Sequence, residues 1–162
     1  MRRVTIGAAR TASDDRPVQR RRLEPLGYRS CVDLLTGARI GRVIYTSGAM
    51  PAAQPVTYGI DEDDIIFCTD RGSALDVAVS GAVVAFEADD IDLDTQQGWS
   101  VLAVGHAHRV TDQQRLADLH VRFPRSIWTG PLTSTIAIPI TQVTGRRLPK
   151  ATPPAKPLDG PP

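Results

Sequence analysis

Two histidines and two cysteines are the residues of this chain whose types and spacing first suggest chemistry. His106 and His108 lie two residues apart, so on an extended strand both side chains point to one face and could chelate a metal ion. No third Cys or His lies close by in the sequence, and we therefore expect no metal site. Cys31 and Cys68 have no C-x-x-C spacing and no histidine beside them, so we interpret them as buried thiols rather than nucleophiles.

A run of alternating acidic residues, Asp90-Ile91-Asp92-Leu93-Asp94, resembles the start of a calcium-binding loop. Its sixth position is Thr95, where the loop needs Gly, and its twelfth is Val101, where the loop needs Glu. We therefore interpret the run as a solvated acidic hairpin. The chain also lacks the G-x-G-x-x-G, P-loop and G-x-S-x-G patterns, so nothing supports a Rossmann, P-loop or hydrolase class.

Composition and charge narrow the class further. The chain has 162 residues, of which 41% are hydrophobic and 23% charged, which is typical of one globular domain. No apolar run approaches the ~20 residues that span a bilayer. A net charge of +1 argues against a large basic surface for nucleic acid. We expect a cytoplasmic protein with neither a membrane nor a nucleic-acid partner.

Charge and proline content divide the chain into three parts. Residues 1–24 hold seven Arg against three acids and show no apolar period, which predicts a disordered basic arm, either a solvated leader or a tether for anionic partners. Residues 149–162 contain six Pro and predict a flexible tail. Both lysines, Lys150 and Lys156, lie in this tail. An anion site in the folded domain, 25–148, must therefore use Arg, backbone N–H groups or helix ends.

Short β-branched and apolar runs between turn residues indicate that the domain is mainly β. Strands are expected at 40–45, 54–60, 65–69, 82–87, 98–110 and 136–143. Gly105 should bend the longest strand, and Pro139 indicates an edge or a bulge in the last one. There is no alternation of strands and helices, and so many short strands favour a closed barrel.

Two or three short helices are expected beside these strands. Ser30 and Asp33 fit a capping box, which predicts a helix that begins at Ser30 and ends at Gly37. The other helices are expected over 74–79, with Ser73 as the cap, and from Thr111-Asp112 to about His120.

The motifs on these elements follow one another in a recognisable order. They are Gly41-Arg42-Val43, Pro55-Val56-Thr57-Tyr58, Ile66-Phe67-Cys68-Thr69 with Gly72-Ser73, Val84–Asp89, Gly98-Trp99-Ser100-Val101 with Gly105, and Val143–Arg147. Over about residues 26–148 the series resembles the pyridoxamine 5′-phosphate oxidase-like split-barrel family, in particular its actinobacterial members. The resemblance implies a six-stranded antiparallel split β-barrel that forms a homodimer, with FMN in the cleft between the subunits. It also implies an oxidoreductase that acts on a small-molecule substrate.

The resemblance also implies which residues hold the flavin. The ring would lie along Val56, Thr57 and Tyr58. The phosphate would lie near Cys68, Thr69, Arg71, Gly72 and Ser73. Trp99 and Ser100 would approach from the long strand, and Trp128 and Arg146 would close the cleft, from the same or the second subunit. No general acid or base is assigned, and Tyr58 is the nearest candidate.

The chain departs from the family pattern at two positions that usually carry a cation. Cys68 lies between the aromatic residue and the Thr of its strand, and Ala74 follows the Ser of the turn. A charged hydrogen bond contributes roughly 1.5–3 kcal/mol, so two lost anchors predict FMN binding weaker by about two to four decades. Arg71 and the helix start at Ser73 are the candidates to compensate.

Three alternatives stay open. The cofactor could be a deazaflavin in place of FMN. The chain could instead be a non-catalytic protein that binds haem or a lipid-like molecule in the same cleft. A third option is a regulatory or interaction module that works through the basic arm.

Overall fold

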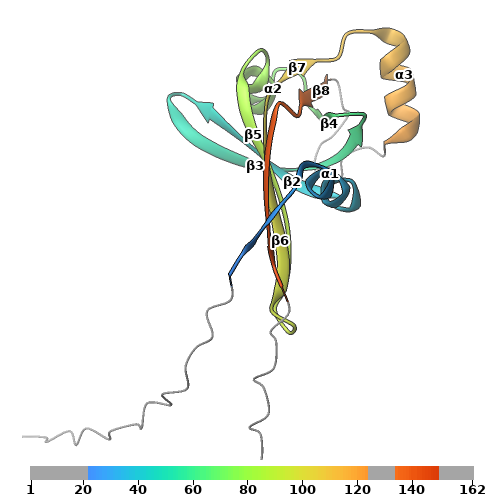
Figure 1. The fold of residues 1–162 in the computed structure, drawn as a ribbon. Helices are drawn as coiled ribbons and strands as arrows, with labels where there is room; N and C mark the ends of the chain where they lie inside the picture. The colour runs from blue at the N-terminus through green and yellow to red at the C-terminus, as the bar shows by residue number, and fades with distance from the viewer. Residues whose placement is uncertain (1–21, 124–133, 150–162) are drawn as a thin grey trace, which may run out of the picture.

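The computed structural model describes residues 22–123 and 134–149. Within them the chain forms nine antiparallel strands in one sheet, in the order β1-β9-β6-β5-β2-β3-β4-β8-β7 (Figure 1). The strands are β1 (Glu24–Leu26), β2 (Ile40–Ser47), β3 (Met50–Asp61), β4 (Asp64–Thr69), β5 (Val83–Asp92), β6 (Gln97–His106), β7 (His108–Arg109), β8 (Ser134–Pro139) and β9 (Gln142–Leu148). The predicted arm and tail lie outside the described residues except for 22–24 and 149.

The sheet curls because β3 changes partner halfway along its length. Residues 50–57 of β3 pair with β2, whereas residues 58–61 pair with β4. The curl brings β6 against β8 at Gly105, where a Cβ atom would lie 1.9 Å from the carbonyl oxygen of Pro139. Only glycine fits so close a crossing. Of the expected antiparallel split barrel, the mainly β, antiparallel class is therefore confirmed, in the form of a curled sheet that folds back on itself at Gly105.

The expected count of six strands differs from the nine in the described residues. The run 98–110 divides at Ala107, whose N–H donates to the carbonyl of Ala82, and β7 then pairs with β8 instead of β5. The run 136–143 divides between β8 and β9, and β1 adds a further short strand beside β9. The first break falls at Ala107 and the second follows Pro139, and at each the chain changes its partner strands.

The first helix, α1 (Tyr28–Gly37), begins earlier than the capping box predicted. Its N-cap is Gly27, no side chain caps it, and the Cys31 N–H donates to the Gly27 carbonyl at 3.1 Å. The prediction of Ser30 as the cap is therefore wrong. The chain passes from β1 into the helix at Gly27, so Ser30 lies within the first turn, and Cys31 and Leu35, one turn apart, both pack fully inside.

The other two helices begin where the sequence predicted. Ser73 caps α2 (Ala74–Val79), and Asp112 caps α3 (Gln113–Arg122) by accepting the Arg115 N–H at 2.7 Å. In α2 the Ser73 hydroxyl accepts the Asp76 N–H at 3.1 Å. Both caps follow from local side-chain chemistry, which the sequence displays directly. No helix in the described part of the chain is long and apolar enough to cross a membrane.

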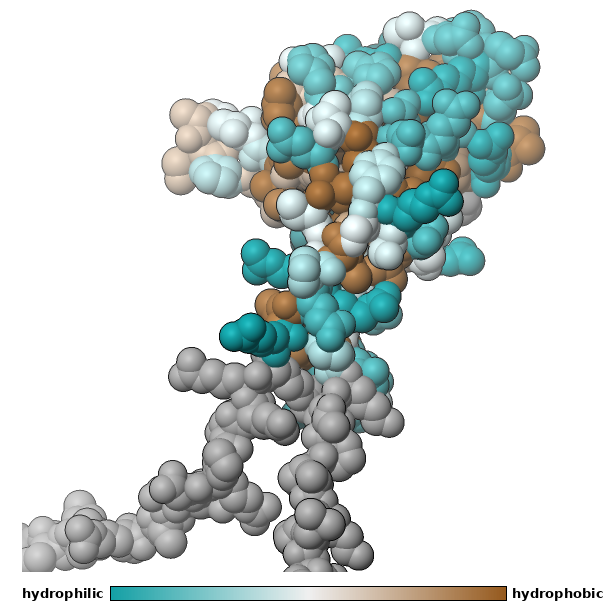
Figure 2. Space-filling view, in the orientation of Figure 1, coloured by the Kyte–Doolittle hydropathy of each residue, from teal (hydrophilic) through white to brown (hydrophobic). Residues whose placement is uncertain are grey.

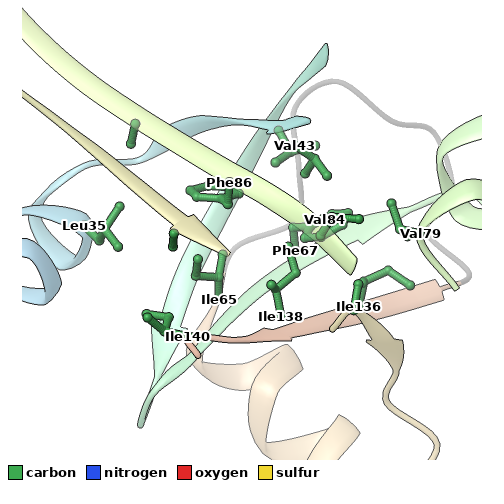
Figure 3. Packing of buried hydrophobic residues seen from close by; sticks show 14 of the residues in the cluster. Leu35, Val43, Ile65, Phe67, Val79, Val84, Phe86, Ile136, Ile138 and Ile140 are labelled. Carbon is green, nitrogen blue, oxygen red and sulfur yellow. The ribbon is translucent and has the colours of Figure 1, made fainter. Parts of the chain in front are cut away.

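The main core fills the inside of the curl (Figure 3). Phe86 lies at its centre, and the missing side chain of Gly41 leaves room for the Phe86 ring. A smaller apolar cluster of Ile66, Ala137, Val110 and Leu119 lies on the outer face of β4 and β8, beneath α3. Helix α3 thus covers part of the outer face of the sheet, and its own outer surface is largely hydrophilic (Figure 2).

Ion pairs fix α3 to the β3–β4 hairpin. Arg115 binds Asp64 at 2.6 Å and Asp61 at 3.4 Å, and Arg122 also binds Asp61. The ring of Phe123, just beyond the helix, packs on Gly59, where a Cβ atom would collide with it. These contacts set the position of α3 relative to the outer face of β4 and β8.

Candidate functional site: the β4–α2 turn and the outer face of β3, β4 and β8

The turn between β4 and α2 gathers most of the residues predicted for the phosphate. The Thr69 hydroxyl is buried and lies 3.1 Å from the Ser73 hydroxyl. Gly72 has a φ of 80°, in the left-handed region that favours glycine, and its N–H donates to Oδ2 of Asp76 at 2.7 Å. Thr69, Gly72 and Ser73 therefore lie together in the turn. The Gly72 N–H and the Ser73 hydroxyl are both bound to Asp76.

Asp76 forms a two-point ion pair with Arg109 of β7. Nε of Arg109 donates to Oδ1 at 2.9 Å and Nη2 donates to Oδ2 at 2.7 Å. The Asp76 side chain is 0% exposed and that of Arg109 is 39% exposed. The guanidinium of Arg109 holds the pKa of Asp76 below its usual value. Sequence reasoning missed both residues, although the Ser-x-x-Asp spacing of Ser73 and Asp76 marks a capping position.

A row of small polar side chains crosses the outer face of the sheet beside α3. The Cys68 thiol of β4 lies 3.6 Å from the Thr135 hydroxyl of β8, which in turn lies 3.3 Å from Nε2 of His120 on α3. Burial raises the pKa of the Cys68 thiol, so this group is protonated at neutral pH. Tyr58 of β3 pairs with Phe67 of β4 in the antiparallel ladder. Thr57 therefore lies next to this pair on β3, and Cys68 lies next to it on β4, on the same side of the pair. Alternation along the strands therefore turns Thr57 and Cys68 to the same outer face.

The Thr57 hydroxyl stands apart from the rest of this row. Its Oγ1 atom is buried and has no hydrogen-bond partner among the described residues. A buried hydroxyl without a partner costs about 1–3 kcal/mol, so such groups in folded proteins are usually bonded to something. The Thr57 hydroxyl is therefore a candidate contact for a ligand atom.

Val56 and Tyr58, the other two residues predicted for the flavin ring, point into the core. Val56 is buried, and the Tyr58 ring packs edge-on against Phe86 with centroids 4.6 Å apart. The Tyr58 hydroxyl donates to the Leu35 carbonyl at 2.7 Å, and burial raises the pKa of Tyr58. In this position Tyr58 supports the barrel and cannot exchange a proton near neutral pH. A ring along β3 would meet the backbone of these residues and the side chain of Thr57.

A cavity of about 220 Å³ opens next to the row, between α3, the β4–α2 turn and the β7–β8 ribbon. It is lined by Arg71, Arg109, Val110, Thr111, Gln113, Leu116, His120, Ser134 and Thr135. Arg71, predicted to compensate for the missing cations, is exposed and faces this cavity together with Arg109. The two guanidinium groups come from segments 38 positions apart, so the fold alone brings them together.

The remaining predicted residues lie away from this turn. Trp99 of β6 pairs with Arg147 of β9, and its neighbour Ser100 pairs with Arg146. These residues lie on the adjacent strands β6 and β9, and β6 runs down from the main body in Figure 1. Trp99 lines two cavities there, of about 480 Å³ and 290 Å³, both rich in aspartate. In the single chain these residues do not meet Thr69–Ser73, and Trp128 lies outside the described residues.

The curled antiparallel sheet places this protein in the mainly β class, as a half-barrel. The family model of pyridoxamine 5′-phosphate oxidase matches residues 28–147, and this chain belongs to that family. An uncharacterized protein of Mycobacterium tuberculosis is 34% identical over 140 residues, which cover 82% of this chain and 90% of that protein.

Two solved structures give the fold in more detail. The FAD-binding protein of Mycobacterium smegmatis is 28% identical with a TM-score of 0.62, and the match covers 78% of this chain and 98% of that one. A putative pyridoxamine 5′-phosphate oxidase of Corynebacterium glutamicum is 20% identical with a TM-score of 0.68, and the match covers 80% and 96% of the two chains. The second likeness shows the fold alone.

Proposed function

We propose that this protein binds a flavin nucleotide, FMN or FAD, on the outer face of β3 and β4 and acts as an oxidoreductase on a small-molecule substrate. Membership of the family supports the proposal, as does the likeness to a protein that is named as FAD-binding. The observation in this chain that carries it is the buried hydroxyl of Thr57, which has no partner among the described residues. It lies on the strand along which the flavin ring is expected.

The residues of the outer face fit a flavin ring. The edge of the ring carries nitrogen and oxygen atoms, and the Thr57 hydroxyl can donate to one of them or accept from one. The protonated Cys68 thiol adds no charge beside the ring. A bound flavin would supply hydride transfer, which is chemistry that the side chains of the protein lack. Thr57 and the strand backbone would orient the ring, and the cavity beside α3 lies next to it.

The β4–α2 turn fits a phosphate less well. The Gly72 N–H and the Ser73 hydroxyl, which would face the phosphate, already bind Asp76. A second anion placed against them would also lie close to the buried Asp76 carboxylate, which repels it. Together with Cys68 and Ala74 at the usual cation positions, this arrangement favours weak binding of the nucleotide unless its phosphate is held elsewhere.

We further propose that the protein works as a homodimer, with the cofactor cleft between two copies. Met50, Val77 and Val83 are large apolar side chains that are each more than 60% exposed in the single chain. A second copy that covers such surface would remove it from water. The dimer also explains how Trp99 and Arg146 of one copy would approach the site of the other.

A titration of the purified protein with FMN, FAD, a deazaflavin and haem, followed by absorbance and fluorescence, tests the function. We expect saturable binding of FMN or FAD. Thr57→Val, which keeps the shape and removes the hydroxyl, should weaken that binding by about 2- to 10-fold, since one hydrogen bond contributes about 0.5–1.5 kcal/mol. Thr46→Val, on an exposed part of β2, is the matched control and should change nothing.

If the protein binds the deazaflavin but neither FMN nor FAD, the proposed cofactor changes and the oxidoreductase proposal stands. Binding of haem without any flavin would favour a non-catalytic binding protein. Flavin binding that is equal in the wild type and in Thr57→Val would show that the ring lies elsewhere.

A further inference from the structure

The face of the sheet that packs the core continues beyond the core across the strands β5, β6, β9 and β1. Residues directly opposite one another in the ladders share a face. The last row of this face that packs inside is Ala88, Val101, Gly145 and Leu26. The next row on the same face is Asp90, Trp99, Arg147 and Glu24. In this second row Trp99 is partly buried and the other three side chains are exposed, so the face is open here.

Two cavities adjoin on this open row, because both are lined by Asp90 and Trp99. The cavity of about 480 Å³ lies toward the end of α1 and is also lined by Gly37. The cavity of about 290 Å³ lies toward the turn between β5 and β6 and is also lined by Asp92. We name the two cavities together the Trp99 groove.

The lining of the Trp99 groove suits guanidinium groups. The carboxylates of the groove that form no ion pair with another described residue are Asp33, Asp90 and Asp92. They outnumber the two arginines of the groove, Arg39 and Arg147. The carbonyl groups at the end of α1 add partial negative charge. The ring of Trp99 lies where the two cavities adjoin, and guanidinium groups stack on aromatic faces.

A segment of this chain that is rich in arginine leaves the fold next to the groove. Residues 16–22 hold four Arg and no acid, and they lead directly into β1. In the ladders Glu24 of β1 is opposite Arg147, which is opposite Trp99. Neighbouring strands lie ~4.8 Å apart, so β1 is ~10 Å from β6. Seven extended residues span up to about 25 Å, so the segment is long enough to reach both cavities.

From this placement and this charge we infer that the Trp99 groove is the docking site of residues 16–22 of the same chain. The guanidinium groups of the segment bind the aspartates of the groove and stack on Trp99. The docked segment thereby covers the open end of the core face. One exposed ion pair contributes little, but several together should favour the docked state by about 3- to 10-fold. The inference does not depend on the proposed flavin function.

Limited digestion of the full chain with trypsin measures the docking, because the rate of cleavage reports the undocked fraction. Mass spectrometry follows cleavage after Arg20 and Arg21, relative to cleavage after Arg10, which lies outside the segment. We expect the double variant Asp90→Asn, Asp92→Asn to raise this ratio by about 3- to 10-fold. Thermal unfolding confirms that the variant is folded.

The matched control is the double variant Glu62→Gln, Asp118→Asn, which removes two exposed carboxylates away from the groove. It should leave the ratio unchanged. Salt provides a test without substitution, since the Debye length falls from about 10 Å at 0.1 M to about 3 Å at 1 M. In 1 M salt the ratio should rise in the wild type and hardly change in the groove variant. Equal ratios in wild type, groove variant and control at low salt would overturn the inference.

A disulfide test separates docking within one chain from docking on a second copy. Mild oxidation of the variant Arg20→Cys, Asp92→Cys should join positions 20 and 92 and keep the mass of a single chain on a non-reducing gel. The control Arg20→Cys, Asp118→Cys should form no such bond. A bond between 20 and 92 that doubles the mass would assign the groove to the arm of a second copy and overturn docking in the same chain. No excess of the bond over the control would overturn docking altogether.

Discussion

Asp76 and Arg109 meet through two hydrogen bonds, of 2.9 Å and 2.7 Å, between the start of α2 and the short strand β7. The carboxylate is fully buried and the guanidinium is partly exposed. One ion pair therefore does two things. Its carboxylate accepts the Gly72 N–H of the β4–α2 turn, and its guanidinium lies at the edge of the cavity beside α3.

The two partners of this pair should differ in their effect on stability. Arg109→Gln leaves the Asp76 carboxylate buried without its partner, which should cost about 3–5 kcal/mol of the free energy of unfolding. Asp76→Asn leaves Arg109 free to reach water and should cost less, about 1–3 kcal/mol. Urea denaturation of both variants measures the difference. Equal losses, or a larger loss in Asp76→Asn, would contradict the burial of the carboxylate.

The contribution of Asp76 should also depend on pH. Its pKa is lowered in the folded state, so the charged carboxylate stabilises the fold above the unfolded value of about 3.9. That stability is lost as the pH falls through the folded pKa. We expect the stability difference between wild type and Asp76→Asn to be constant above about pH 5 and to shrink below about pH 4. A difference that grows on acidification would reverse the sign and refute this assignment.

Closure of the sheet should depend on Gly105. Gly105→Ala places a methyl group against the backbone of Pro139, which cannot move aside as a side chain would. We expect a loss of at least about 3 kcal/mol. Gly37→Ala is the control, because nothing lies within 4 Å of the added atom. It should be neutral or slightly stabilising. Thermal unfolding of the two variants under one condition provides the comparison.

Tyr58 and Thr57 are neighbours on β3 but should act on different properties. Tyr58→Phe removes the hydroxyl that donates to the Leu35 carbonyl and keeps the ring on Phe86. It should cost about 1 kcal/mol of stability and leave flavin affinity within about twofold. Thr57→Val should instead weaken flavin affinity and leave the free energy of unfolding nearly unchanged. A strong loss of flavin affinity in Tyr58→Phe, without loss of stability, would place Tyr58 in the site rather than in the core.

The homodimer proposal has a direct test. Light scattering at micromolar concentration should give twice the mass of one chain. Adding a charge at one exposed apolar position, as in Val83→Lys, should shift the mass toward one chain if that position is covered by the second copy. A single-chain mass for the wild type would contradict the proposal of a cofactor cleft between two subunits.

The sequence predicted features that depend on local chemistry. The cap at Ser73 and the helix start at Thr111-Asp112 were predicted because a hydroxyl or carboxylate at that place binds the first turn of its own helix. The strand segments and the mainly β class followed from apolar runs between turn residues, and the ordered motifs led to the family, whose resemblance implied the antiparallel sheet. The predicted turn residues Thr69, Gly72 and Ser73 also lie together.

The features that the sequence did not predict depend on contacts between distant segments. The N-cap of helix α1 is Gly27, directly after β1 pairs with the distant strand β9, so Ser30 falls within the first turn rather than at the cap. The long run 98–110 divided because its end found a different partner strand. The pairing of Asp76 with Arg109 joins residues 33 positions apart, and no local pattern relates them.

The visible absorption spectrum of the purified protein, recorded during titration with FMN or FAD, tests the central claim most directly. The account predicts saturable shifts of the flavin bands, and Thr57→Val should need higher flavin concentrations to reach the same shift. Spectra that equal the sum of free flavin and protein at every concentration, from a protein whose unfolding curve shows it to be folded, would contradict the claim that this chain is a flavin-binding member of its family.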